Sequence, residues 1–130
     1  MSQIEDIAWA VGLYEGEGSA SVNNRDRTPV VNLSTTDLDT IERFHRIVGV
    51  GRIGTYRPPL PRKPLYQWSV TKSDEIIQVL TLFIDSGYLG SRRLEQANKV
   101  LVRAREIKPH RNKRRDLALL VKLGLKEANV

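Results

Sequence analysis

The hydrophobic positions of this 130-residue chain follow two different periods. Near the N-terminus, Ile4, Ile7, Val11 and Tyr14 recur every three or four residues, which is typical of the buried face of a helix. Residues 19–23 instead alternate between small or apolar and polar side chains, which is the period of a strand. The pattern as a whole predicts helices over residues 3–15, 37–48, 73–84, 91–108 and 111–129, and strands over residues 19–23, 30–34, 52–57 and 65–71.

Local signals support these boundaries. Ser2 and Glu5 have the spacing of a capping box, and Thr36 and Gly49 are expected to start and end the second helix. Short turns join the strands in pairs, which predicts two antiparallel hairpins. The order is therefore αββαββα with two further C-terminal helices, an α+β class in one domain spanning residues 1–130. The two halves of this order look alike but share no sequence repeat.

The charge of the chain is +6 and is unevenly distributed. Residues 92–115 contain ten Lys or Arg against two Glu, whereas residues 1–91 contain nine basic and eleven acidic side chains. A regional basic excess favours a nucleic acid or another polyanion as partner, although a basic run can also be only a solvated helix junction. The chain has no cysteine, no signal-peptide pattern and no long apolar run, so we expect an intracellular protein, cytoplasmic (nucleoid-associated) or organellar, with no membrane partner and no secretion.

Small residues occupy one strip of the first predicted helix. Ala8, Gly12 and Gly16 are spaced four residues apart, beside the apolar face. A glycine costs about 1 kcal/mol in a helix interior, so the strip indicates that another backbone packs closely there. That backbone can belong to a neighbouring element of the same chain or to a second copy of the chain.

Two glutamates, Glu15 and Glu17, follow within the same segment, each before a glycine. If the helix ends near Glu15, the carboxylate of Glu17 lies at the negative end of the helix dipole, where a cation would stabilise it. Carboxylate and carbonyl oxygens suit magnesium or calcium, but a single carboxylate supplies too few ligands to hold either ion. A homodimer whose first helices cross at the small-residue strip would bring two Glu17 side chains together, and paired carboxylates with divalent ions are usual for phosphodiester cleavage.

Residues 10–18, AVGLYEGEG, resemble the nine-residue signature of the LAGLIDADG homing endonucleases. Residues 44–53, 66–70 and 88–97 resemble three further landmarks of that family in the same order, so the resemblance covers roughly residues 4–105. It implies a site-specific double-stranded DNA endonuclease, associated with intron or intein mobility, that acts as a homodimer on a long, near-palindromic target. It further implies a sheet that forms a DNA-binding saddle, a dimer interface through Ala8, Gly12 and Gly16, and Mg²⁺ or another divalent ion such as Mn²⁺ as cofactor. Ca²⁺ is expected to bind without supporting cleavage, and no organic cofactor is implied.

The resemblance also assigns roles in the site. Glu17 corresponds to the metal-binding acid of the family, Gly16 can add its carbonyl as a metal ligand, and Glu15 corresponds to an acid that we interpret as structural. The implied catalytic residues are Glu17, Arg93, Arg92 and Thr35. Either arginine would lie near the scissile phosphate, where relatives more often have lysine, and the threonine stands near a position where relatives often place a water-ordering glutamine.

Alternation along the strands predicts which side chains face DNA. The inward set is Ala20, Val22, Val31, Leu33, Ile53, Tyr66, Trp68 and Val70. The opposite set is Ser19, Ser21, Asn23, Asn32, Ser34, Arg52, Tyr56, Gln67, Ser69 and Thr71. Basic residues at strand ends and loops that suit phosphates or outer bases are Arg25, Arg27, Arg57, Arg62, Lys63 and Lys72. The plainer alternative is a solvated sheet face.

Two other functions remain open at this stage. A non-cleaving nucleic-acid-binding protein of the same fold, such as an RNA maturase or a transcriptional regulator, would keep the basic saddle and tolerate loss of the acid. A metabolic or structural helix-sheet domain would need neither.

Overall fold

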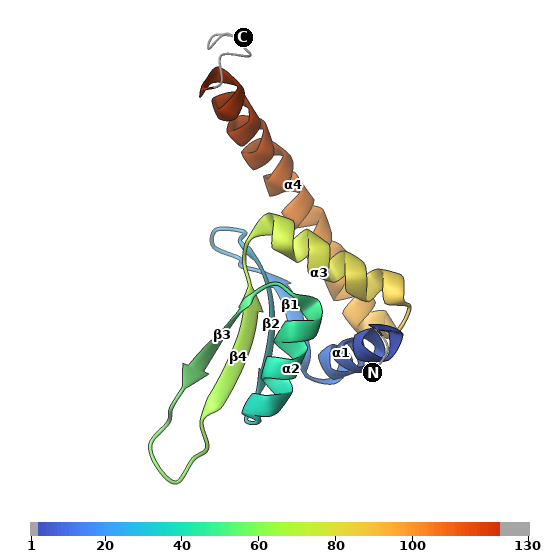
Figure 1. The fold of residues 1–130 in the computed structure, drawn as a ribbon, viewed down its shortest axis with the longest axis vertical. Helices are drawn as coiled ribbons and strands as arrows, with labels where there is room; N and C mark the ends of the chain where they lie inside the picture. Colours follow the sequence, from blue (N-terminus) through green and yellow to red (C-terminus); the bar gives the residue numbers. More distant parts are fainter. Residues whose placement is uncertain (1–2, 123–130) are drawn as a thin grey trace.

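The computed structural model describes the backbone of residues 3–122 and the side chains of residues 3–107. Figure 1 shows the elements in chain order. They are α1 (Gln3–Glu17), β1 (Gly18–Val22), β2 (Pro29–Thr35), α2 (Leu38–Val48), β3 (Arg52–Tyr56), β4 (Leu65–Val70), α3 (Ser73–Ser86) and α4 (Ser91–Lys122). The predicted αββαββα order and the α+β class are confirmed. No helix within residues 3–122 is both long and apolar enough to cross a membrane.

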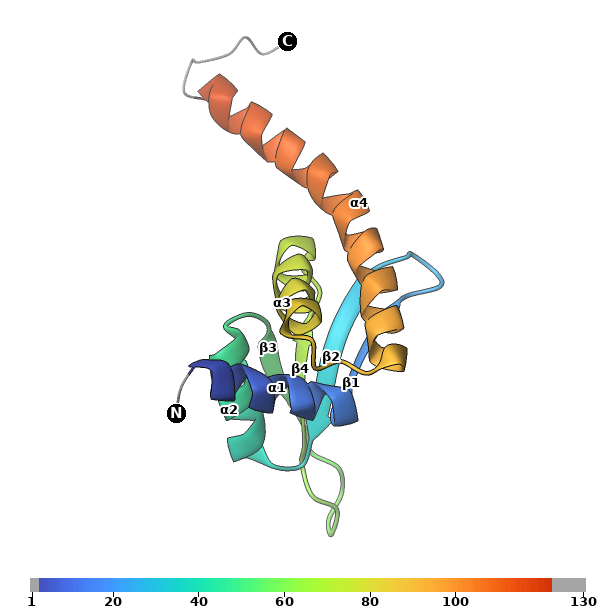
Figure 2. The ribbon, with the colours of Figure 1, turned by 90° about the vertical axis from the view of Figure 1, so that its right-hand side faces the viewer.

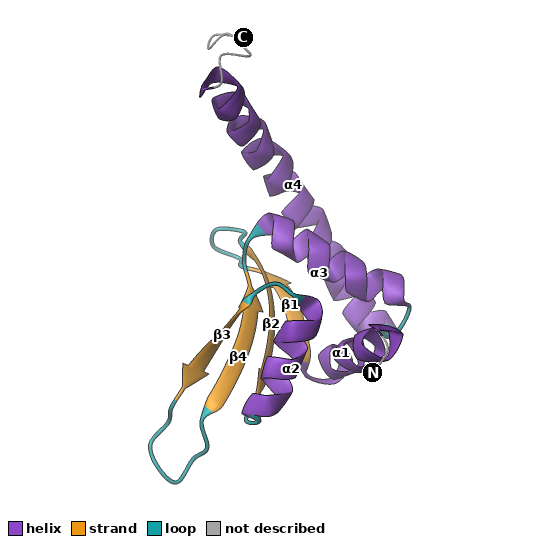
Figure 3. Cartoon of the chain, viewed as in Figure 1, coloured by secondary structure: helices purple, strands orange, loops and turns teal. Residues whose placement is uncertain are grey.

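The four strands form one antiparallel sheet with the order β1-β2-β4-β3. Both predicted hairpins are present, and β2 pairs with β4 to join them at the centre. The helices lie together on one side of the sheet, as the secondary-structure colouring in Figure 3 shows. The opposite surface of the sheet, here called the open face, is covered by none of the described elements.

Aromatic side chains fill the core between the sheet and the helices. Phe44 meets the ring of Trp68 edge-on at a centroid distance of 4.8 Å, and Tyr14 lies 4.6 Å from Phe83. All four side chains are fully buried. The indole Nε1 of Trp68 donates a hydrogen bond of 2.8 Å to the carbonyl of Val50, so its polar atom is satisfied inside the core.

The ends of α2 show one confirmed prediction and one error. Gly49 ends the helix with φ of 76°, a left-handed conformation that glycine adopts without strain. The N-cap, however, is Asp37 rather than Thr36, because the extended Asp37 lets its carboxylate accept from the backbone N–H of Asp39 at 3.1 Å. The hydroxyl of Thr35 in turn accepts from the N–H of Asp37 at 3.2 Å.

Other helix boundaries also differ from the prediction, including that of α3, which ends at Ser86 rather than near Ile84. Helix α1 continues to Glu17 instead of ending near Glu15, and the chain passes directly into β1 at Gly18, where a Cβ atom would collide with the ring of Tyr14. The two predicted C-terminal helices are one, because α4 spans Ser91–Lys122 and includes Pro109. Figure 2 shows α4 as one long helix. A proline inside a helix removes one backbone hydrogen bond, and its ring crowds the carbonyl four residues earlier, at a cost of about 3 kcal/mol. The predicted break before Pro109 followed this rule, and α4 departs from it. Ser2 and residues 123–129 lie outside the described part.

Candidate metal site and nucleic-acid interface

The last turn of α1 presents the candidate metal ligand to solvent. Glu17 is the final helical residue and is exposed, and within residues 3–107 its carboxylate has no hydrogen bond or ion pair. Because Gly18 pairs with Leu33, Glu17 lies at the Ser34–Thr35 end of β2. The structure therefore brings the predicted acid and Thr35 to the same end of the sheet.

Glu15 is directed away from this exposed position. Its carboxylate is half-buried, and Oε2 accepts a hydrogen bond of 3.0 Å from the backbone N–H of Gly90, just before α4. A side chain at Gly90 would collide with this carboxylate, so the two segments fit closely. The contact ties the end of α1 to the start of α4.

The two candidate arginines lie in different environments. Arg93 is half-buried; its Nε donates to the carbonyl of Glu15 at 3.1 Å, and its Nη1 donates to Oε1 of Gln96 at 3.1 Å. A guanidinium on one of the last carbonyls of α1 stabilises the negative end of that helix. Arg92, the neighbouring residue, is exposed. Arg93 is thus held beside the motif by protein acceptors, whereas Arg92 faces solvent.

Tyr14 lies beneath the same corner of the fold. Its hydroxyl is buried and has no hydrogen-bond partner among the described residues. Burial raises the pKa of Tyr14 to about 12, an effect that the nearby charge of Arg93 partly opposes and that of Glu15 reinforces. A buried, unpaired hydroxyl is costly, whereas the ring of Tyr14 packs closely under Gly18.

The small-residue strip of α1 is open. Gly12 and Gly16 are exposed, and no atom of the described chain lies within 4 Å of the position that a Cβ would take at either residue. Ala8 is half-buried at the edge of the strip. Trp9 lies next to it, with the Cζ atom of Arg43 3.9 Å from its ring centroid. Close packing by another element of the same chain is therefore excluded at the two glycines for the described residues.

The sheet faces follow the predicted alternation. Five of the inward residues are buried, and Val22, Ile53 and Tyr66 are half-buried and pack against the core. On the open face, Ser19, Asn32, Ser69 and Arg52 form one row across the four strands. Ser21, Arg52, Tyr56 and Gln67 are exposed, and Ser19, Asn32, Ser34 and Ser69 are half-buried. The assignment of Asn23 and Thr71 to strands is wrong, because β1 ends at Val22 and β4 ends at Val70.

Two apolar residues lie on the open face that were not among the side chains predicted for it. Val30 pairs with Ser21, and Leu65 pairs with Tyr56, so both lie on the same face as their polar or exposed partners. The period-2 pattern through Leu65, Gln67 and Ser69 already carried this information.

Cations surround the open face at its loops. Arg25, Arg27, Arg57, Arg62, Lys63 and Lys72 are all exposed. The β1–β2 turn is anchored by Asn23, whose Oδ1 accepts from the N–H of Arg25 at 2.7 Å. Arg103 of α4 donates to the carbonyl of Arg27 at 2.8 Å, so α4 supports this turn. The ion pair between Arg27 and Glu106 is long, 3.9 Å, and exposed, so it adds little stability.

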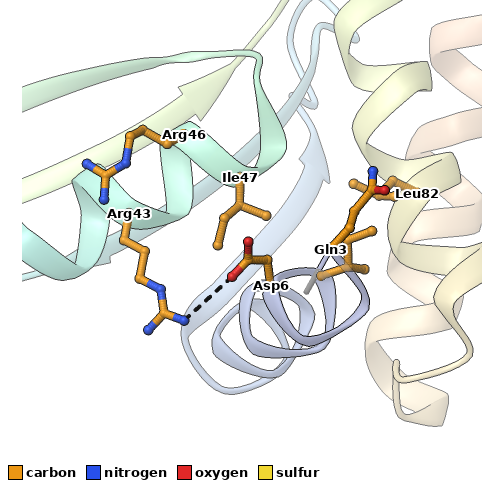
Figure 4. A pocket seen from close by; sticks show the side chains of 7 residues that line it. Gln3, Asp6, Arg43, Arg46, Ile47 and Leu82 are labelled. Atoms are coloured by element: carbon orange, nitrogen blue, oxygen red, sulfur yellow. Dashed lines mark ion pairs between the residues drawn. The ribbon is translucent and has the colours of Figure 1, made fainter. Parts of the chain in front are cut away.

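A cavity of about 470 Å³ lies in the helical layer, away from the open face. Figure 4 shows its lining, including the 3.9 Å ion pair between Asp6 and Arg43. The remaining lining residues are Gln3, Ile7, Arg46, Ile47 and Leu82. None of them belongs to a strand or to the exposed end of α1, so the cavity is separate from the candidate site.

The oxygen donors at the end of α1 suit a hard divalent cation. They are the exposed carboxylate of Glu17 and the backbone carbonyl of Gly16. Within the described residues, no three His, Cys, Asp or Glu side chains gather closely enough to hold a metal ion. A metal at Glu17 would therefore need oxygen ligands from outside the described residues, such as a second Glu17, phosphates or water.

Comparison with known proteins places this geometry in a known fold. No family model and no curated protein matches the sequence. Among solved structures, the homing endonuclease I-CvuI in complex with its target in the presence of 2 mM Ca aligns over 95% of this chain and 82% of its own, with a TM-score of 0.62 and 18% identity. The group I intron-encoded homing endonuclease I-CeuI complexed with DNA aligns over 90% of this chain and 61% of its own, with a TM-score of 0.62 and 13% identity.

The LAGLIDADG meganuclease I-AabMI bound to uncleaved DNA aligns over 79% of this chain, with a TM-score of 0.61 and 17% identity. The chain has the fold of the LAGLIDADG homing endonucleases. It covers only 37% of the I-AabMI chain, and the low identities limit the likeness to the fold. The predicted homing-endonuclease-like fold is confirmed.

Proposed function

We propose that this chain is a site-specific, divalent-metal-dependent endonuclease of double-stranded DNA that acts as a homodimer. The observation that carries the proposal is the combination, on one α1 helix, of an open glycine strip and an exposed Glu17 at its end. Two chains joined through this strip would bring the two carboxylates close to a two-fold axis. The open faces of the two sheets would then form a continuous surface that supports binding to a near-palindromic target.

The open face is the part of each chain that binds the target. Arg52 and Gln67 are exposed there and match the hydrogen-bonding edges of guanine and adenine in a major groove. The six exposed cations at the strand ends and loops neutralise phosphates. This division assigns sequence readout to the sheet and salt-dependent affinity to its borders.

Glu17 and the carbonyl of Gly16 would hold the divalent ion, with Mg²⁺ as the expected ion. When bound, such an ion lowers the pKa of an attacking water and stabilises the leaving oxygen. Glu15 and Arg93 fix the end of α1 through Gly90 and the Glu15 carbonyl, so the backbone that carries Glu17 is held in place. Arg92, which is exposed, is the better placed of the two arginines to reach a phosphate. The Thr35 hydroxyl keeps its proton free to orient a water molecule, because it acts only as an acceptor toward Asp37.

A cleavage-site selection tests this function. The protein is incubated with a random duplex DNA library in Mg²⁺, and the cut molecules are sequenced, with EDTA as the control. We expect a long, near-palindromic consensus that appears only with the divalent ion. Capture of specific sites without cleavage in Mg²⁺ or Mn²⁺ would instead favour the alternative, a non-cleaving nucleic-acid-binding protein such as a transcriptional regulator. Preferential binding of structured RNA would favour a maturase.

A further inference from the structure

The open face carries an apolar pair among its polar residues. Tyr56 of β3 and Leu65 of β4 are register partners at the end of the β3–β4 hairpin. The two residues are 63% and 38% exposed, so both present apolar surface to solvent. They share the face with Gln67, two residues along β4, so the pair belongs to the surface that would meet DNA.

A recess lies beside this pair. It has a volume of about 230 Å³ and is lined by Gly54, Thr55, Tyr56, Leu65 and Gln67. Gly54 is the register partner of Gln67, and no described atom lies within 4 Å of the position that its Cβ would take. The missing side chain leaves room for a small group to approach the sheet between the glutamine amide and the apolar pair.

The surroundings of the recess favour DNA over an apolar protein partner. The β3–β4 loop carries Arg57, Arg62 and Lys63, all exposed, and no acidic residue. Arg52 is exposed on the same strand as Tyr56. A small apolar patch bordered by cations matches the major groove, where phosphates flank the bases and the thymine 5-methyl is the one apolar group on the base edges.

We propose that Tyr56 and Leu65 contact the 5-methyl group of a thymine in the major groove of the target, beside an adenine bound by Gln67. The assignment rests on the proposed DNA-binding function. Side chains two residues apart on a strand are separated by about 6.8 Å, and base pairs rise by about 3.4 Å, so the two contacts lie at most about two base pairs apart. Each half-site thus contains an A·T-rich element read by this hairpin, and the contact selects DNA over RNA, which lacks the methyl group.

Single replacement of thymine by uracil in a selected target tests the proposal, because it removes only the methyl group. Binding is measured for the wild type, Leu65→Ala and the control Leu60→Ala. Leu60 is 93% exposed in the β3–β4 loop and belongs to neither strand, so its truncation makes the same chemical change and leaves Tyr56 and Leu65 intact. At one thymine per half-site, we expect uracil to weaken binding by the wild type and by Leu60→Ala by about fourfold, which is the effect of one buried methyl group. Leu65→Ala should bind the thymine and uracil targets equally.

Tyr56→Ala provides a second variant with the same expected loss of discrimination. The thymine contact is refuted if, at every thymine tested, replacement by uracil changes binding by the wild type no more than binding by the two variants. The proposed function stands in that case, provided that the DNA is still bound and cut. Weaker self-association of Leu65→Ala without DNA, measured by sedimentation, would also refute it by assigning the patch to a protein contact. Failure of the wild type to bind any duplex would instead contradict the proposed function.

Discussion

Replacement of Gly12 by leucine is expected to separate the dimer without unfolding the subunit. No described atom lies within 4 Å of a Cβ at Gly12 and the residue is exposed, so the described part of the chain leaves room for the leucine. Leucine is about 1 kcal/mol more favourable than glycine inside a helix, so the isolated subunit should gain stability. In a dimer, each of the two leucines would enter a contact that has room only for backbone, at a cost of about 1–3 kcal/mol per copy.

The two copies together give about 2–6 kcal/mol, which raises the dimer dissociation constant by at least about 30-fold. Sedimentation equilibrium over a range of concentrations measures this constant, and circular dichroism checks that the helices are kept. Gly12→Ala is the matched control, with a much smaller expected effect. A Gly12→Leu protein that remains a dimer with the wild-type dissociation constant would refute packing through this strip.

Three further predictions follow from individual contacts. Arg52→Ala should reduce the ratio of cognate to random DNA affinity by about 5- to 150-fold, whereas Lys63→Ala should weaken both equally and lower the salt dependence; an unchanged ratio for Arg52→Ala would remove it from base readout. Tyr14→Phe should stabilise the fold by about 1 kcal/mol in urea unfolding, because it removes a buried hydroxyl without a partner among the described residues; a loss of stability would indicate a bonded hydroxyl. Because the pKa of Tyr14 is raised to about 12, the wild type should lose stability as the pH rises above about 10, and Tyr14→Phe should lose less.

The sequence was sufficient for the order of elements and the faces of the sheet, because both depend on periodicity. Trp68 and Leu33 are buried and Gln67 is exposed, as alternation requires. One error has a local cause. Asp37 is the cap in place of Thr36 because its carboxylate accepts the N–H of Asp39 in the first turn of α2. The break predicted before Pro109 does not occur, and no contact of the described residues explains why α4 continues through a proline.

The contacts within the site could not be predicted, since they join segments far apart in the sequence. Nothing in the local pattern indicates that Glu15 accepts the N–H of Gly90 or that Arg93 reaches the carbonyl of Glu15. Whether the glycine strip is exposed also depends on the tertiary structure, because the same spacing occurs where a helix packs against another element of its own chain. The roles of Glu17, Arg92, Arg93 and Thr35 in catalysis stay predictions.

Cleavage of a selected cognate duplex in Mg²⁺ by the wild type, Glu17→Gln and Glu15→Gln tests the central claim most directly. Glu17→Gln keeps the size of an exposed side chain and removes its charge, so we expect DNA binding to persist while cutting of both strands falls by orders of magnitude. Glu15→Gln keeps an oxygen that can accept from Gly90, so it should cut at a rate close to that of the wild type. Normal cleavage by Glu17→Gln would contradict the account, and loss of cleavage by Glu15→Gln alone would place the metal on the other glutamate.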